Sequence, residues 1–87
     1  NFIEVIFMKV KDAVVERFKD ICEYKNLKPI ELATKAGVTP SSVYSMFDET
    51  RRNVSIVLIK KLCDGLDMTL EEFFTSEIFN KLEQEIK

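Results

Sequence analysis

The stretch that most constrains the fold is residues 31–47, which read ELATKAGVTPSSVYSMF. A helix-forming run stops at Gly37, where a positive φ costs nothing because glycine has no Cβ. Two residues later, Thr39 and Pro40 supply the N-cap and the first position of a new helix. The stretch therefore predicts two short helices joined by a tight turn. Ala33 is small enough to let the two helices cross closely.

The composition agrees with a helical fold. The chain has 87 residues, which is enough for one small domain and not for two. It contains only two Gly and two Pro, whereas all-β folds spend more of both on turns. A hydrophobic fraction of 46% and a charged fraction of 32% are those of an ordinary folded domain. We therefore predict an all-α fold.

Capping signals predict five helices between residues 12 and 75, including the two above. A first helix is expected over residues 12–25, a fourth from about residue 56 and a fifth from about residue 70. Each carries apolar residues at three- and four-residue spacing, which predicts one buried face. The residues expected to begin or end these helices are Asn26, Pro29, Ser55 and a T-x-x-E capping box of Thr69 and Glu72. The expected apolar stripes are Val14, Val15, Phe18, Ile21 and Cys22; Leu32, Ala33 and Ala36; Val43, Met46 and Phe47; Ile56, Ile59, Leu62, Cys63 and Leu66; and Leu70, Phe73 and Phe74.

The two ends of the chain are less constrained. Residues 1–11 are interpreted as an N-terminal arm, and the EVIF before Met8 can be encoded by a purine-rich ribosome-binding sequence, which favours Met8 as the biological start. The alternative is an apolar arm that packs on the domain or on a partner. Residues 76–87 place Ile78, Leu82 and Ile86 four apart and predict a sixth helix. That helix either docks on the bundle or forms a dimer seam, and the sequence leaves both open.

The charge is unevenly distributed along the chain. The net charge is −2, but residues 25–61 carry seven basic and three acidic residues. Residues 62–87 carry two basic and seven acidic residues. A basic middle and an acidic tail predict one surface that faces a polyanion and one that faces elsewhere.

Several classes of protein are disfavoured. No apolar run approaches the roughly 18 residues of a membrane span, so we expect no membrane association. Cys22 and Cys63 form no CxxC pair and the chain has no His, which argues against a zinc site or another cofactor. Both are expected to be reduced, buried thiols in a cytoplasmic protein. No nucleophile–base pair and no phosphate-binding loop is visible, so an enzyme is not expected.

Two short helices joined by a tight turn with Gly form a helix-turn-helix. Residues 31–47, the basic loop after them and the following SIVLIKKLCDGLDMTLEEFF together resemble the lambda-repressor-like, Cro/XRE-type DNA-binding domain of transcriptional regulators. The resemblance covers about residues 13–75. It implies a compact five-helix bundle whose third helix lies in the DNA major groove, with double-stranded DNA as the partner.

By this resemblance, the third helix reads bases and neighbouring helix ends hold phosphates. Pro29 stands where the family often has Gln, so one phosphate contact is missing. The reading positions also lack Gln, Asn and Arg, so we expect modest direct readout helped by DNA shape. The expected base-facing residues are Pro40, Ser41, Tyr44 and Ser45, and the expected phosphate-facing residues are Lys28, Thr39, Ser42, Arg51, Arg52 and Ser55.

Simpler interpretations remain open for these residues. The serines and Tyr44 can be ordinary solvated surface, and Ser42 can serve only to complete the helix cap. Arg51 and Arg52 can simply balance Asp48 and Glu49.

The sequence therefore favours a bacterial or phage-type transcriptional regulator that binds a palindromic operator as a homodimer. It favours repression over activation. We expect no small-molecule domain beside the DNA-binding fold. The alternative is a module of the same fold that binds another regulatory protein, as an antitoxin does, and binds DNA weakly or not at all.

Overall fold

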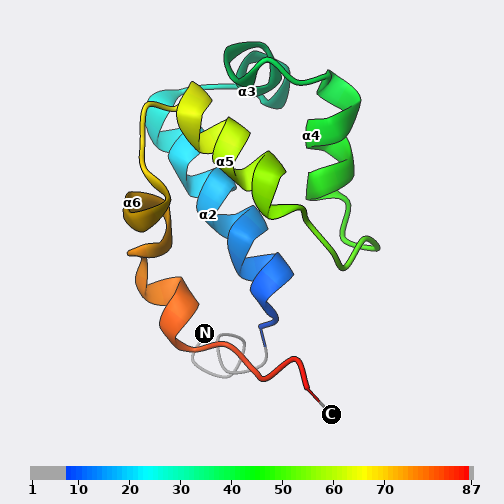
Figure 1. Cartoon of the computed structure of the whole chain (residues 1–87), viewed down its shortest axis with the longest axis vertical. Helices are drawn as coiled ribbons and strands as arrows, with labels where there is room; N and C mark the ends of the chain where they lie inside the picture. The colour runs from blue at the N-terminus through cyan, green and yellow to red at the C-terminus, as the bar shows by residue number, and fades with distance from the viewer. Residues whose placement is uncertain (1–7, 87) are drawn as a thin grey trace.

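A computed structural model describes residues 8–86 of the chain. Over this range all regular secondary structure is helical, with five α-helices, one 3-10 helix and no strand (Figure 1). The elements are α2 (Val10–Lys25), α3 (Pro29–Ala36), α4 (Pro40–Phe47), α5 (Ile56–Gly65), α6 (Leu70–Phe74) and η1 (Glu77–Asn80). The predicted all-α bundle with a helix-turn-helix is therefore confirmed.

Local chemistry accounts for most of the helix ends. Asn26 and Gly37 end α2 and α3 in the left-handed region, with φ of 56° and 69°. The hydroxyls of Thr39, Ser55 and Thr69 cap α4, α5 and α6, as the sequence predicts.

The helix α2 begins at Val10, two residues earlier than predicted. The Asp12 carboxylate accepts a hydrogen bond from the backbone N–H of Lys9 (3.4 Å), so Asp12 occupies the third helical position and not the start. Val10 and Lys11, assigned above to the N-terminal arm, thus belong to the helix. The prediction about Met8 as the start concerns residues 1–7, which lie outside the described residues.

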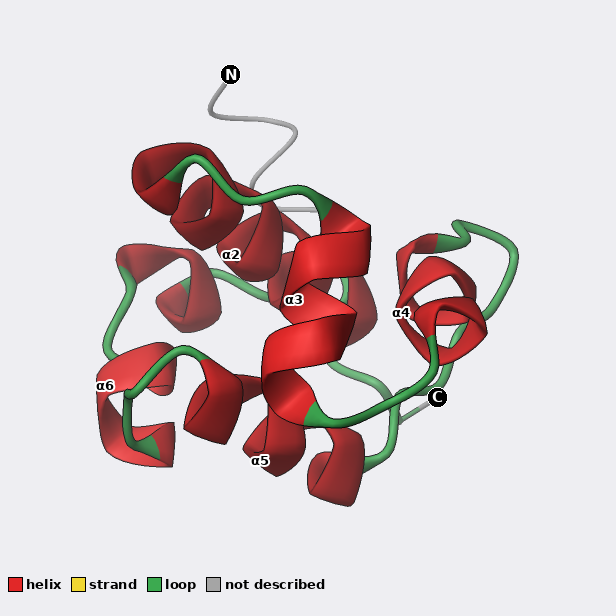
Figure 2. Ribbon diagram, turned by 90° about the horizontal axis from the view of Figure 1, so that it is seen from above, coloured by secondary structure: helices red, strands yellow, loops and turns green. Residues whose placement is uncertain are grey.

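The core lies where α2, α3, α4, α5 and α6 converge. Its fully buried side chains include Phe18, Leu32, Val43, Leu62 and Phe73. The helix α3 packs against both α4 and α5, and α4 lies at one edge of the bundle in both views (Figure 1, Figure 2).

One predicted core residue is wrong. Ile56, the first residue of the α5 stripe, is 58% exposed, whereas Leu58 in the same turn packs against the core. The stripe that is buried in α5 begins one turn later, at Ile59.

A close approach between helix backbones sets the α3–α5 packing. A Cβ placed on Gly65 would lie 2.8 Å from the backbone nitrogen of Ala36. Any side chain at this position would push α5 away from α3, because the obstacle is backbone and cannot rotate aside.

The predicted sixth helix is wrong. Only Glu77–Asn80 is helical, as a single 3-10 turn, and residues 81–86 are irregular. The backbone N–H of Glu83 donates to the Met8 carbonyl (3.0 Å), so it does not continue a helical ladder. Ile86 is 80% exposed, which breaks the predicted stripe, and Phe79 packs on Phe73 and Phe74 instead.

The C-terminal segment therefore docks on its own chain. Lys9 donates through Nζ to the Gln84 carbonyl (3.1 Å) and pairs with the Glu83 carboxylate (3.0 Å). This contact is within one chain, and a dimer seam at this segment stays a prediction. No helix within residues 8–86 is long and apolar enough to cross a membrane.

Candidate nucleic-acid interface

The turn between α3 and α4 is built from backbone hydrogen bonds around Gly37. The N–H of Gly37 donates to the Thr34 carbonyl (3.3 Å) and that of Val38 to the Ala33 carbonyl (3.1 Å). This pattern closes α3 with a left-handed residue and reverses the chain within three residues. It fixes the angle between α3 and α4.

The helix α4 has one buried and one outward face. Val43 and Met46 are buried, whereas Pro40 and Ser41 are exposed and Ser45 is half-buried. Tyr44 is 54% exposed and lies on the flank of the helix, where it lines an apolar groove with residues of α2 and α3. The outward face of α4 thus presents hydroxyl groups and no charge.

Three hydroxyl groups gather at the start of α4. Thr39 Oγ1 accepts from the Ser42 backbone N–H (3.3 Å) and lies 2.9 Å from Ser42 Oγ and 3.1 Å from Ser41 Oγ. Ser42 therefore completes the cap, as one of the interpretations above held, while Ser41 keeps an exposed hydroxyl. Each hydroxyl has both donor and acceptor capacity, so the cluster can still bond to an external group.

The starts of α3 and α5 are capped by side chains of the same chain. Lys28 precedes α3 with an exposed side chain, and its own N–H donates to Glu31 Oε1 (2.8 Å). Ser55 Oγ accepts from the N–H groups of Val57 (3.1 Å) and Leu58 (3.3 Å). A helix N-terminus carries a partial positive charge that favours an anion such as phosphate.

The two arginines of the α4–α5 loop point to different partners. Arg51 Nε lies 3.9 Å from Asp48 Oδ2, and the Arg51 side chain is 65% exposed. Arg52 instead donates two hydrogen bonds, of 3.1 and 2.9 Å, to the Asp12 carboxylate of α2. The hydrogen bonds from Arg52 lower the pKa of Asp12, so the pair is charged at neutral pH. Arg52 thus balances an acid that lies 40 residues away and not its neighbours in the loop.

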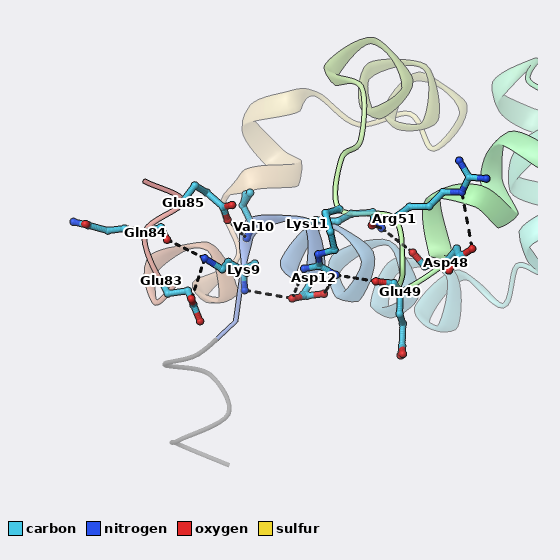
Figure 3. A network of polar contacts seen from close by, with 11 residues as sticks. Lys9, Val10, Lys11, Asp12, Asp48, Glu49, Arg51, Glu83, Gln84 and Glu85 are labelled. Carbon is cyan, nitrogen blue, oxygen red and sulfur yellow. Dashed lines mark hydrogen bonds and ion pairs between the residues drawn. The ribbon is translucent and has the colours of Figure 1, made fainter. Parts of the chain in front are cut away.

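Lys11 organises the same loop and is absent from the predicted site. Its side chain is 3% exposed, and Nζ donates to the carbonyls of Asp48 (3.2 Å) and Arg51 (2.7 Å) (Figure 3). Burial lowers the pKa of this lysine. A sequence signal existed, because Lys11 stands three and seven residues before Val14 and Phe18, on the apolar face of α2.

Comparison with known proteins identifies the fold. A sequence model of the Cro/C1-type HTH (helix-turn-helix) DNA-binding domain matches residues 17–77. The chain belongs to this family. A comparison with solved structures finds the crystal structure of the prophage Lp1 protein 11, with a TM-score of 0.75 and 27% sequence identity. That match covers 85% of this chain and 97% of the prophage protein. A search of curated proteins finds no match.

Membership of the Cro/C1-type family implies that the domain binds double-stranded DNA. In this Cro/C1-type domain, α3 and α4 are the helix-turn-helix, and the loop that carries Arg51 and Arg52 directly follows α4. The predicted base-facing residues share one helix. The predicted phosphate-facing residues come from the start of α3, the start of α4 and the loop up to the α5 cap.

Proposed function

We propose that this domain is a transcriptional repressor that binds a palindromic operator as a homodimer, with α4 in the major groove. The observation that carries the proposal is the uncharged, hydroxyl-bearing outer face of α4, exposed at the edge of the bundle beside the loop that carries Arg51 and Arg52. The proposed base contacts are Pro40, Ser41, Tyr44 and Ser45. The proposed phosphate contacts are Lys28, Thr39, Ser42, Arg51, Arg52 and Ser55.

The chemistry of α4 supports modest direct readout. A serine hydroxyl fits several acceptors on base edges, and Pro40 or Tyr44 can lie against a thymine methyl group. None of these side chains makes the bidentate contacts by which Arg, Asn and Gln distinguish bases. Most affinity would then come from phosphates, and part of the specificity from DNA shape.

Two domains acting together would compensate for the few contacts of one. A homodimer doubles the phosphate contacts and defines a site with two half-sites, roughly 34 Å apart. The likeness to a prophage protein supports a regulator of bacterial or phage origin. Free, buried Cys22 and Cys63 are consistent with action in the reducing cytoplasm.

The test is salt-dependent DNA binding. Fragments enriched from genomic DNA by the purified protein would be measured by fluorescence anisotropy over a range of salt concentrations. The logarithm of affinity should fall linearly with the logarithm of salt concentration. Arg51→Gln should make that dependence shallower, reducing the magnitude of the slope by about 0.9.

The control is Lys81→Gln, which removes the same charge from the residue directly after η1. Figure 1 shows η1, in orange, on the opposite side of the bundle from α4. It should leave the slope unchanged. If no fragment binds even at low salt, the domain is not a DNA-binding regulator.

A second candidate is a module that binds another regulatory protein. Ile56 and Val57 are each 58% exposed in the first turn of α5, where a phosphate contact would favour polar side chains. Failure of DNA binding together with stable complex formation with one regulatory protein, abolished by Ile56→Ser, would favour this function.

A further inference from the structure

The ion pair between α2 and the α4–α5 loop has a geometry that competes with DNA. Arg52 Nη1 and Nη2 each donate to one oxygen of Asp12, and Nη1 also donates to the Glu49 carbonyl (2.9 Å). A phosphate group offers a guanidinium the same arrangement of two oxygens. Arg52 cannot present its paired edge to Asp12 and to a phosphate at the same time.

The neighbouring arginine provides the contrast. Arg51 has no carboxylate within hydrogen-bond distance among the described residues, since its contact with Asp48 is 3.9 Å long. The Arg51 backbone is held by Lys11 through its carbonyl, which leaves the side chain outward. One loop therefore presents one available and one occupied guanidinium.

The occupied guanidinium is held loosely enough to be exchanged. The side chains of Arg52 and Asp12 are 48% and 40% exposed, and ion pairs of such exposure contribute little to stability. Asp12 also places a negative charge beside a loop proposed to face a polyanion. Glu85, which accepts a hydrogen bond from the Val10 N–H (3.2 Å), lies near the same arginine and adds to that charge.

We propose that Asp12 withholds Arg52 from DNA and so limits the affinity of the domain for the phosphate backbone. The contact is autoinhibitory, because DNA must displace an intramolecular carboxylate to recruit the second arginine. This inference rests on the proposed function, since it assigns a limit to the same DNA-binding surface.

The experiment measures binding of the full chain to a mixed-sequence DNA duplex, because such binding is phosphate-driven and needs no knowledge of the operator. Asp12→Asn should bind more tightly than the wild type, with a salt slope steeper by about 0.9. Between roughly 50 and 200 mM salt, its affinity should then fall about 3.5-fold further than that of the wild type.

Two further variants isolate the pair. Arg52→Gln should bind less tightly than Asp12→Asn, and adding Asp12→Asn to the Arg52→Gln background should give no gain over Arg52→Gln alone. Glu16→Gln removes one acid from the same helix without touching Arg52, because Glu16 pairs with Lys19 (3.9 Å), and should leave the slope unchanged. Unfolding temperatures of all variants establish that each is folded at the assay temperature.

The outcomes are distinct. If the wild type binds DNA and Asp12→Asn binds no more tightly, this proposal alone is overturned. Weaker binding by Asp12→Asn also overturns it, since the pair would then serve to position the loop. A gain that persists without Arg52 also overturns it, since general charge removal would then be the cause. If neither wild type nor Asp12→Asn binds duplex at low salt, the proposed function fails and this proposal fails with it.

Discussion

Replacing Lys11 with methionine should destabilise the domain, because it removes the cation that holds the α4–α5 loop. Methionine keeps a long unbranched side chain in the buried site but has no donor for the carbonyls of Asp48 and Arg51. Hydrogen bonds from a charged donor contribute about 1.5–3 kcal/mol each, but water can partly replace the donor at an exposed loop. Removing the buried ammonium also removes its desolvation cost, which the lowered pKa of Lys11 reflects.

The net expectation for Lys11→Met is a loss of about 1–2 kcal/mol in the free energy of unfolding. For a domain of this size, each kcal/mol corresponds to about 4–8 °C in Tm. Calorimetry measures that shift directly. Lys19→Met is the matched control, because this lysine lies on the same helix with a 53% exposed side chain and should change Tm little. An unchanged or raised Tm for Lys11→Met would show that the two hydrogen bonds do not outweigh the cost of burying the charge.

Three more predictions follow from the packing and the titrating groups. Gly65→Ala should lower the free energy of unfolding by about 1–3 kcal/mol, because the new Cβ meets the backbone of Ala36. Urea denaturation measures this as a lower midpoint. A higher midpoint, which helix propensity alone predicts, would contradict the packing. The pKa of Asp12 is lowered from 3.8, so its contribution to stability is present above that pH and is lost as the pH falls through the lowered value. The stability difference between wild type and Asp12→Asn should therefore be constant near neutrality and shrink in acid, as thermal unfolding across pH will test. Burial raises the pKa of Cys22 and raises that of Cys63 to about 11. Both thiols should therefore resist iodoacetamide in the folded protein at neutral pH and react on unfolding, which mass spectrometry measures. Rapid labelling of the native protein would contradict their burial.

The candidate site was predictable in position and less so in detail. The outward residues of α4 follow from helical spacing once Val43 and Met46 are assigned to the core. The role of Lys11 did not follow, because a lysine among apolar residues is ordinarily placed at the surface. Its burial depends on two carbonyls in a loop that lies 37 and 40 residues further along the chain.

The sequence alone determined most of the places where the helices begin and end. Gly37 and Asn26 adopt positive φ, and Thr39, Ser55 and Thr69 cap, because each effect involves only a residue and the turn beside it. These local effects were enough to define the helix-turn-helix.

The tertiary structure decided what depends on distant partners. The segment after Asn80 is irregular, with the Glu83 N–H donating to Met8, and the ion pair of Arg52 is with the Asp12 carboxylate of α2 and not with an acid of its own loop. Gly65 matters through the backbone of α3, not through its own φ. In each case the neighbouring sequence does not fix the arrangement, and the partner that the folded bundle brings within reach decides it.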